Sequence, residues 1–401
     1  MLTSLALIFL GGLSLAALFQ KLKLPRIIGM LIAGILLGPF VLNWLDPSIL
    51  GISADLRKMA LVIILIKAGL SLNLKDLKKV GRPALLMAFL PASFELLAFL
   101  LLAPAVLGIG TLEAAVIGSV LSAVSPAVVV PRMVQLIEDG HGTRKGIPQM
   151  ILAGASLDDV FVIVLFTTVT GMAQGNGVQL LTFLNIPIAI ISGVLLGAVS
   201  GFILARFFDA CYQHQHMIRN SMKVILILSA AFLLLAVETL LEGTFAVSGL
   251  LAIMSMAMSL AMFSPPSVTK RLQAKYGKLW LAAEVILFVL VGAAVDIRYT
   301  AQAGLGAVFM IFLGLLFRSV GVWLCMLGTA LNKQERLFCV IAYLPKATVQ
   351  AAIGGIPLAL GLPCGKLVLS VAVLAILITA PLGAIGIDST YKKLLSDHPN
   401  G

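Results

Sequence analysis

Residues 148–167 read PQMILAGASLDDVFVIVLFT, an apolar stretch in which Asp158 and Asp159 are the two charged side chains. It is long enough to cross the hydrocarbon core of a bilayer, which takes about 20 residues in a helix. A charge at the centre of a membrane costs roughly 2.5–3.5 kcal/mol on insertion scales, so two adjacent aspartates there need a functional reason. The stretch therefore predicts a membrane span that carries a functional pair of acids.

Composition places the whole chain in the same class. Of its 401 residues 60% are hydrophobic and 11% are charged, too few charges to cover the surface of a soluble protein of this length. Long apolar runs recur and do not alternate with polar residues, which favours membrane helices over a transmembrane barrel. We expect an all-α polytopic membrane protein. A net charge of +11 is then typical of basic cytoplasmic loops, and no nucleic-acid partner is expected.

Hydropathy predicts the spans and their orientation. It divides the chain into about 13 transmembrane helices, over residues 2–20, 27–45, 59–73, 83–107, 112–137, 148–173, 180–205, 221–240, 244–263, 279–296, 302–330, 337–361 and 366–387. Lysine and arginine gather in the loops on one side, whereas the other side has only Arg57, Lys58, Arg298 and Lys366. By the positive-inside rule the N-terminus lies outside and the C-terminus is cytoplasmic.

Two of these spans contain prolines that break a helix. One break is predicted near 125–131, SPAVVVP, and the other near 345–357, PKATVQAAIGGIP. Aligning Pro126 with Pro345 also lays the preceding and following spans on each other, and an odd number of spans per unit inverts the second copy. The pattern predicts two inverted repeats with two crossed broken helices, which is the arrangement that surrounds the midplane site of many transporters.

The paired aspartates have a chemistry that suits exchange. Consecutive helix positions point about 100° apart, so Asp158 and Asp159 have different neighbours. Two carboxylates this close resist ionising together, and a carboxylate holds either a proton or a hard cation such as Na⁺ or Li⁺. Competition for one site is the minimum chemistry of exchange. The alternative interpretation is a buried hydrogen-bonding pair with a structural role.

Other polar residues in the spans are candidates for supporting roles. Glu95 and Arg318 are the lone charges of equivalent helices in the proposed repeat, and we expect them to form a structural ion pair. Lys346 lies in the broken part of its span, where it either balances exposed helix ends or takes part in transport. We expect accessory oxygens or donors from a set of uncharged side chains: Ser125, Ser156, Thr348 and Gln350.

Four motifs resemble one family. They are SAVSPAVVVP, GHGTRKGIPQMILAGASLDDV, LVGAAVDI and LPKATVQAAIGGIP. Together they are similar to the sodium/proton antiporters of the cation/proton antiporter superfamily, in the paired-aspartate (NHA-type) branch. The resemblance implies that Asp158 and Asp159 bind the cation and the proton, with the main role on Asp159. Electrogenic bacterial members have a lysine where this chain has Arg318, so the stoichiometry stays open.

The resemblance also implies an architecture. It predicts a homodimer in a multi-pass plasma membrane, which we expect to be bacterial, with an elevator movement of a core domain and a role in pH homeostasis. The implied division is 1–82 as dimerisation-domain helices, 83–178 as core, 179–210 as a linker helix, 211–300 as dimerisation domain and 301–401 as core. No cofactor and no enzyme activity are expected, because ion gradients supply the driving force.

Several rival functions are open at this stage. A K⁺/H⁺ antiporter of the same superfamily shares the site chemistry, and a sodium-coupled organic-anion symporter shares the crossed-helix plan. An intramembrane aspartyl protease needs two aspartates facing each other from separate helices, which adjacent residues on one helix do not provide. A passive channel does not need a buried titratable pair. The leading hypothesis is a secondary transporter that exchanges Na⁺ or Li⁺ for H⁺.

Overall fold

The computed structural model describes residues 1–22, 24–71, 74–175, 180–213, 218–241 and 245–395, and their regular structure is helical. The helices in chain order are α1 (Leu2–Lys21), α2 (Arg26–Leu37), α3 (Pro47–Gly51), α4 (Ser53–Ser71), α5 (Leu74–Met87), α6 (Leu90–Leu107), α7 (Thr111–Leu121), α8 (Pro126–Glu138), α9 (Ile147–Ala173), α10 (Leu180–Gln213), α11 (Asn220–Leu241), α12 (Gly249–Phe263), α13 (Pro266–Ala293), α14 (Ile297–Cys325), α15 (Lys333–Ala342), α16 (Thr348–Ile353), α17 (Ile356–Ala359) and α18 (Gly365–Leu394).

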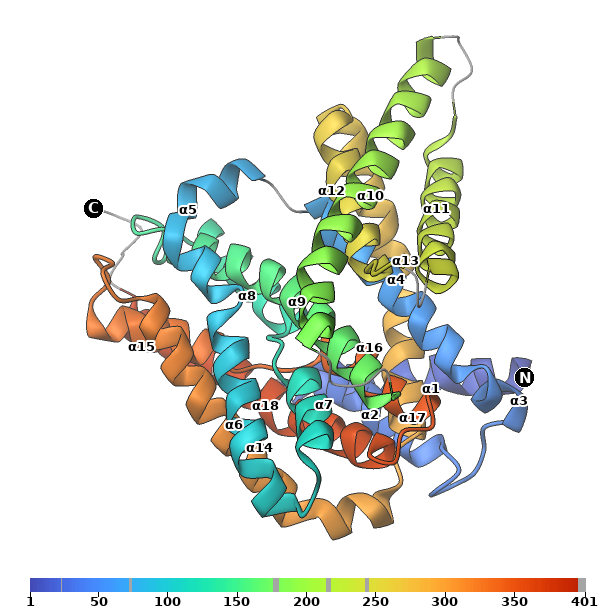
Figure 1. Cartoon of the computed structure of the whole chain (residues 1–401), viewed down its shortest axis with the longest axis vertical. Helices are drawn as coiled ribbons and strands as arrows, with labels where there is room; N and C mark the ends of the chain where they lie inside the picture. The colour runs from blue at the N-terminus through green and yellow to red at the C-terminus, as the bar shows by residue number, and fades with distance from the viewer. Residues whose placement is uncertain (23, 72–73, 176–179, 214–217, 242–244, 396–401) are drawn as a thin grey trace.

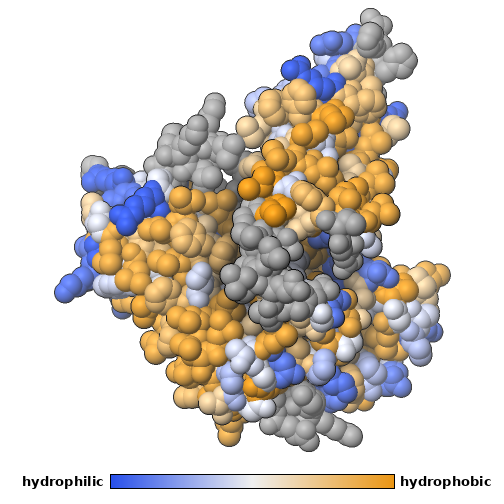
Figure 2. Space-filling model, in the orientation of Figure 1, coloured by the Kyte–Doolittle hydropathy of each residue, from blue (hydrophilic) through white to orange (hydrophobic). Residues whose placement is uncertain are grey.

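Many of these helices are built to cross a membrane. Within the described ranges, eight are long and apolar enough to do so, and further apolar helices of 10–17 residues accompany them. Figure 2 shows hydrophobic residues over most of the visible surface, with hydrophilic residues gathered toward its margins. The predicted all-α membrane class is confirmed, whereas the count of about 13 spans and the inverted repeat stay predictions.

The helices pack as two groups that meet at α16 and where α9 contacts α10 and α12. In one group α6 packs on α14, α14 on α18, and α9 on α5, α7 and α8; it lies to the left in Figure 1. In the other, α12 packs on α10 and α4, and α13 on α2 and α4. The short helix α16 contacts α18 and α7 of the first group and α4 and α13 of the second. The broken helix therefore lies where the two groups meet.

One predicted boundary is wrong in an informative way. The third span, predicted from residue 59, begins at Ser53, so Arg57 lies inside α4 and is 6% exposed rather than in an outer loop. Its Nε donates to the Ser53 carbonyl at 3.2 Å. The predicted span over 83–107 lies within one apolar segment, 81–107, which is long enough to cross a membrane. A two-residue turn at 88–89 divides this segment into the end of α5 and the whole of α6, where Pro91 sits in the first turn.

The first predicted break is also displaced. The unwound segment between α7 and α8 covers residues 122–125, whereas Pro126 and Pro131 lie within α8. Proline is tolerated in the first helical turn, since the N–H it lacks has no intrahelical acceptor there, so Pro126 starts a helix instead of interrupting one. The second break is inside its predicted range: residues 343–347 are unwound, and a bend at Gly354–Gly355 separates α16 from α17.

Candidate functional site

The two unwound segments touch each other. The Ser125 N–H donates to the Pro345 carbonyl at 2.7 Å. The Thr348 N–H donates to Ser125 Oγ at 3.4 Å, and the hydroxyl oxygens of Ser125 and Thr348 lie 3.5 Å apart. Backbone groups that leave a helix inside a membrane need partners within the protein. These bonds supply some of them and fix the crossing of the two segments.

Gln350 satisfies further backbone groups of the crossing. Its Oε1 accepts a hydrogen bond from the Ala347 N–H at 2.9 Å and caps the start of α16. Its Nε2 donates to the Ala123 carbonyl at 2.8 Å and to the Leu121 carbonyl at 3.4 Å, beyond the end of α7. The Gln350 side chain therefore forms hydrogen bonds with backbone groups of both unwound segments that have no partner within a helix. This geometry assigns Gln350 a structural task.

A buried charge cluster lies against the crossing. Arg318 Nη1 lies 3.1 Å from Glu95 Oε2, and Lys346 Nζ lies 2.7 Å from Glu95 Oε1. All three side chains are 0% exposed. Lys346 Nζ also donates to the Leu121 carbonyl at 2.6 Å, and Arg318 Nη1 donates to the Ser122 carbonyl. The two cations thereby neutralise Glu95 and cap carbonyls at the end of α7.

Asp158 is joined to this cluster. Its Oδ2 accepts a hydrogen bond from the Val124 N–H at 2.7 Å and lies 3.2 Å from Arg318 Nη2. The unwound backbone before α8 makes the Val124 N–H available, because an N–H in the middle of a helix is already bonded. Asp158 is 0% exposed, and its Oδ1 has no hydrogen-bond partner. Asp158 is thus bound by the protein at Oδ2 and has no hydrogen-bond partner at Oδ1.

Asp159 has a different environment. It is 7% exposed, and among the described residues it forms no ion pair. Its Oδ1 is buried without a hydrogen-bond partner. Asp158 Oδ1 and Asp159 Oδ1 are carboxylate oxygens without hydrogen-bond partners, which is the donor chemistry that a hard cation prefers. No group of three or more His, Cys, Asp or Glu side chains occurs in the described part of the chain, so a cation here needs neutral oxygens as well.

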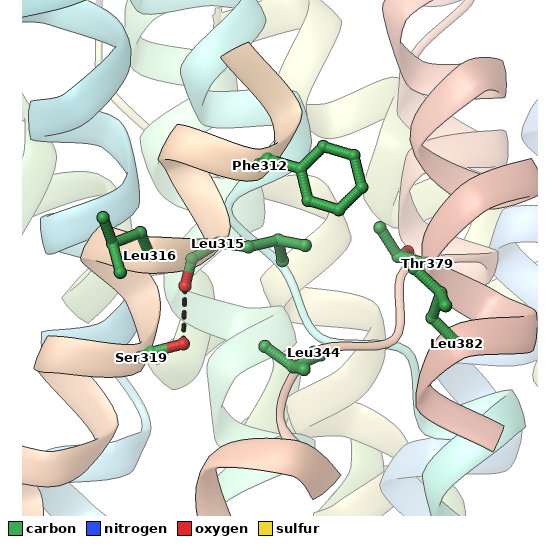
Figure 3. Close-up of a pocket in the computed structure, with 7 residues that line it drawn as sticks. All are labelled: Phe312, Leu315, Leu316, Ser319, Leu344, Thr379 and Leu382. Atoms are coloured by element: carbon green, nitrogen blue, oxygen red, sulfur yellow. Dashed lines mark hydrogen bonds between the residues drawn. The ribbon is translucent and has the colours of Figure 1, made fainter. Parts of the chain in front are cut away.

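A cavity of about 270 Å³ is lined by residues of α14, α18 and the second unwound segment. Figure 3 shows its lining from α14, the unwound segment and α18, with Phe312 on α14 facing Thr379 and Leu382 on α18, and the Ser319 hydroxyl turned to the Leu315 carbonyl. Phe312 and Leu382 are about half exposed on the surface of the helices. Thr379 connects the cavity to the site, because its Oγ1 accepts the Lys346 N–H at 2.9 Å. The lining is apolar and contains no charge, so it does not form a cation path.

The structure brings together most residues singled out from the sequence. Arg318 pairs with both Glu95 and Asp158, and Lys346 pairs with Glu95. Ser125, Thr348 and Gln350 lie at the crossing. The side chain of Ser156 lies outside the described residues.

Two participants were missed. Tyr343 accepts the Arg318 Nε–H at its carbonyl at 2.8 Å, and the Arg318 Cζ lies 5.4 Å from the centre of its ring. Arg57 places its guanidinium against Gly355 of the broken helix. A single tyrosine or arginine at the edge of an apolar run has no periodic signal that would have identified either residue.

The fold has a close relative among solved structures. The sodium proton antiporter MjNhaP1 from Methanocaldococcus jannaschii, determined at pH 8, superposes with a TM-score of 0.85 at 20% sequence identity, covering 99% of each chain. At this identity the likeness establishes the fold and nothing further. It supports an antiporter fold for the arrangement of helices around the crossing.

Sequence comparison goes further. The chain is 34% identical over 389 residues to human sodium/hydrogen exchanger 9B2, covering 94% of this chain and 71% of that protein. It is 32% identical over 391 residues to human sodium/hydrogen exchanger 9B1, covering 94% and 73%. These relatives are mammalian, so the expected bacterial origin gains no support from them. The model of the transmembrane sodium/hydrogen exchanger family matches residues 5–393. The chain is therefore a multi-pass membrane protein that belongs to the sodium/hydrogen exchanger family of the cation/proton antiporter superfamily.

Proposed function

We propose that this chain is a secondary transporter that exchanges Na⁺ or Li⁺ for H⁺ at Asp158 and Asp159. The observation that carries the proposal is the contrast between these neighbours. Asp158 is held by Arg318 at 3.2 Å and by a backbone N–H at 2.7 Å. Asp159 has no ion-pair partner among the described residues and is the more exposed of the two. Asp159 is the carboxylate that is available to a transported ion.

A charge count supports a one-for-one exchange. Glu95 and Asp158 contribute two negative charges, and Arg318 and Lys346 contribute two positive charges at distances of 2.7–3.2 Å. Arginine does not release its proton in proteins, so the positive charge that Arg318 contributes to this balance is permanent. Asp159 is left with one negative charge in a buried site, where an uncompensated charge is costly. One proton or one monovalent cation neutralises it, and the exchange is electroneutral.

Competition follows from the geometry of the oxygens. A protonated Asp159 is neutral and is a poor ligand for a cation, whereas the ionised form offers its unpartnered Oδ1, as Asp158 does. Oxygen ligands of this kind suit small hard cations. Binding of Na⁺ therefore displaces the proton, and a high proton concentration displaces Na⁺. Ser125 and Thr348 carry neutral oxygens at the crossing that could complete the shell.

Alternating access needs the two helix groups to move against each other. We propose that residues 83–178 and 301–401 form the moving core, that 1–82 and 211–300 form the dimerisation domain, and that 179–210 link them. The contacts of α16 with helices of both groups support this division. In this proposal the chain works as a homodimer in the plasma membrane, with its N-terminus outside and its C-terminus in the cytoplasm.

A K⁺/H⁺ antiporter is the second candidate, because the same two carboxylates would serve K⁺. The apolar lining of the described cavity gives a sodium-coupled organic-anion symporter no support.

The test is exchange by the purified protein in liposomes that contain a pH-sensitive dye. We expect Na⁺ and Li⁺ gradients to drive proton movement and a K⁺ gradient to drive none. Clamping the membrane potential at zero should leave the rate unchanged. Asp159→Asn should abolish the signal. Asp388→Asn is the matched control, because Asp388 lies on α18 in a solvent-exposed pair with Arg132 and should keep the wild-type rate.

Three results would contradict the proposal. Exchange by Asp159→Asn at the wild-type rate would remove Asp159 from the site. A K⁺ response equal to the Na⁺ response would favour the K⁺/H⁺ antiporter. A rate that changes with membrane potential would exclude the one-for-one stoichiometry.

A further inference from the structure

Tyr343 is fully buried between the charge cluster and α9. It follows α15 and opens the second unwound segment, and it is 0% exposed. Its main-chain carbonyl accepts the Arg318 Nε–H at 2.8 Å, and its ring lies over the Arg318 guanidinium at 5.4 Å. A phenylalanine would make both contacts equally well. The support that residue 343 gives to Arg318 therefore does not require the hydroxyl.

The hydroxyl of Tyr343 ends against α9 at Gly154. A Cβ atom at position 154 would overlap the hydroxyl oxygen, so the absence of a side chain there is what admits it. The hydroxyl is buried and has no hydrogen-bond partner in the structure. An unsatisfied buried hydroxyl costs stability, and phenylalanine at this position would avoid the cost. The hydroxyl therefore needs a reason other than folding.

The place where the hydroxyl ends is one turn from the paired aspartates. Gly154 and Asp158 are four residues apart in α9 and lie on the same face of the helix. Asp158 Oδ2 is bound by Val124 and Arg318, whereas Asp158 Oδ1 is buried and unpartnered. Two unsatisfied oxygens, one anionic and one neutral, thus belong to the same side of α9 and are not hydrogen-bonded to each other.

We propose that the Tyr343 hydroxyl is a ligand oxygen of the transported cation, completing the site formed by Asp158 and Asp159. A small monovalent cation between these oxygens satisfies both at once, which a hydrogen bond within the protein does not do here. The hydroxyl adds a neutral ligand without adding charge, so the charge balance of the site is preserved. This inference rests on the proposed exchange of Na⁺ or Li⁺ for H⁺.

The test is Tyr343→Phe, compared with wild type and with Tyr276→Phe. Tyr276 is an equally buried tyrosine, but its hydroxyl donates to the Val224 carbonyl at 3.0 Å on the other side of the molecule. We expect Tyr343→Phe to raise the half-saturating Na⁺ and Li⁺ concentrations about tenfold, the value of one lost ligand interaction. The maximal rate and the thermal stability without cation should be unchanged, or the stability slightly increased.

Tyr276→Phe should give the opposite pattern, a lower thermal stability with unchanged half-saturating concentrations. The proposal is overturned if Tyr343→Phe keeps the wild-type values for both cations, or if it loses stability as Tyr276→Phe does while its affinity is unchanged. Failure of the underlying function is seen separately, because wild type itself would then give no Na⁺-driven proton movement.

Discussion

Arg318 Nη2 lies 3.2 Å from Asp158 Oδ2, so the guanidinium that neutralises Glu95 also binds one of the two adjacent aspartates. The buried ion pair of Glu95 and Arg318 and the proposed ion site are therefore not separate features of the core. Asp158 belongs to the permanent charge network, and Asp159 stands outside it. This difference has consequences that can be measured.

Arg318→Ala should lower the free energy of unfolding by about 3–5 kcal/mol, because it leaves the buried Asp158 without its ion-pair partner and Glu95 with Lys346 alone. The measurement is unfolding of the purified protein in mild detergent. Arg132→Ala is the matched control: Arg132 pairs with Asp388 at 2.8 Å at the surface, and its loss should cost no more than about 1 kcal/mol. Similar losses in the two variants would contradict the importance assigned to the buried network.

Glu95 and Lys346 should be coupled in a double-mutant cycle. Glu95→Gln leaves Arg318 and Lys346 as neighbouring cations without the carboxylate between them, and Lys346→Met leaves part of Glu95 unpaired. Each single change should destabilise the protein, and the double variant should lose less than the sum of the two by about 0.5–3 kcal/mol. Additive losses would show that the 2.7 Å contact contributes nothing to stability.

Replacing the two aspartates by asparagine should have different effects on the melting temperature. Asp158→Asn removes a negative charge that faces Arg318 and should lower the melting temperature. Asp159→Asn removes a buried carboxylate that has no ion-pair partner among the described residues, so the melting temperature should stay equal or rise while exchange is lost. Thermal unfolding of both variants in the same detergent checks this. A larger loss of stability in Asp159→Asn would reverse the assigned roles.

Gly355→Ala should disturb the contact between α4 and the broken helix. An added Cβ would overlap the Arg57 guanidinium, whose Nη1 is buried without a partner. We expect slower exchange and lower stability, both restored in large part by a second change, Arg57→Ala, which makes room. Gly277→Ala, in α13 with open space around it, controls for the change of residue. If Arg57→Ala restores neither the exchange rate nor the stability of Gly355→Ala, the contact between Arg57 and Gly355 has no such role.

Much of the fold could be predicted because hydrophobic length and proline position are local signals. The apolar run around Asp158 identified a membrane helix, and the prolines located both breaks to within a few residues. The site was harder to predict, because hydropathy does not say which faces of two helices meet. Glu95 and Arg318 stood out as lone charges, but nothing local indicated that Lys346 reaches the same carboxylate.

The remaining parts of the site depend on backbone geometry. The Val124 N–H binds Asp158 because the chain is unwound there, and no side chain records this. The burial of Arg57 was missed because α4 starts six residues earlier than hydropathy indicates. Its first turns contain charged residues, which hydropathy assigns to the membrane surface. Tyr343 is one aromatic residue in an apolar run, and its role emerges only when Gly154 is seen beside it.

The hydrogen bond from the Ser125 N–H to the Pro345 carbonyl has a mechanical meaning. It joins the two unwound segments at the point where each has lost its helical stiffness. Gln350 also bonds both segments, at the Ala347 N–H and the Ala123 carbonyl. These bonds restrict independent movement of either segment. In the proposed alternating-access movement, a displacement of α8 would therefore be transmitted to α16. Asp158, which is bonded to the Val124 N–H of the same unwound segment, would move with both.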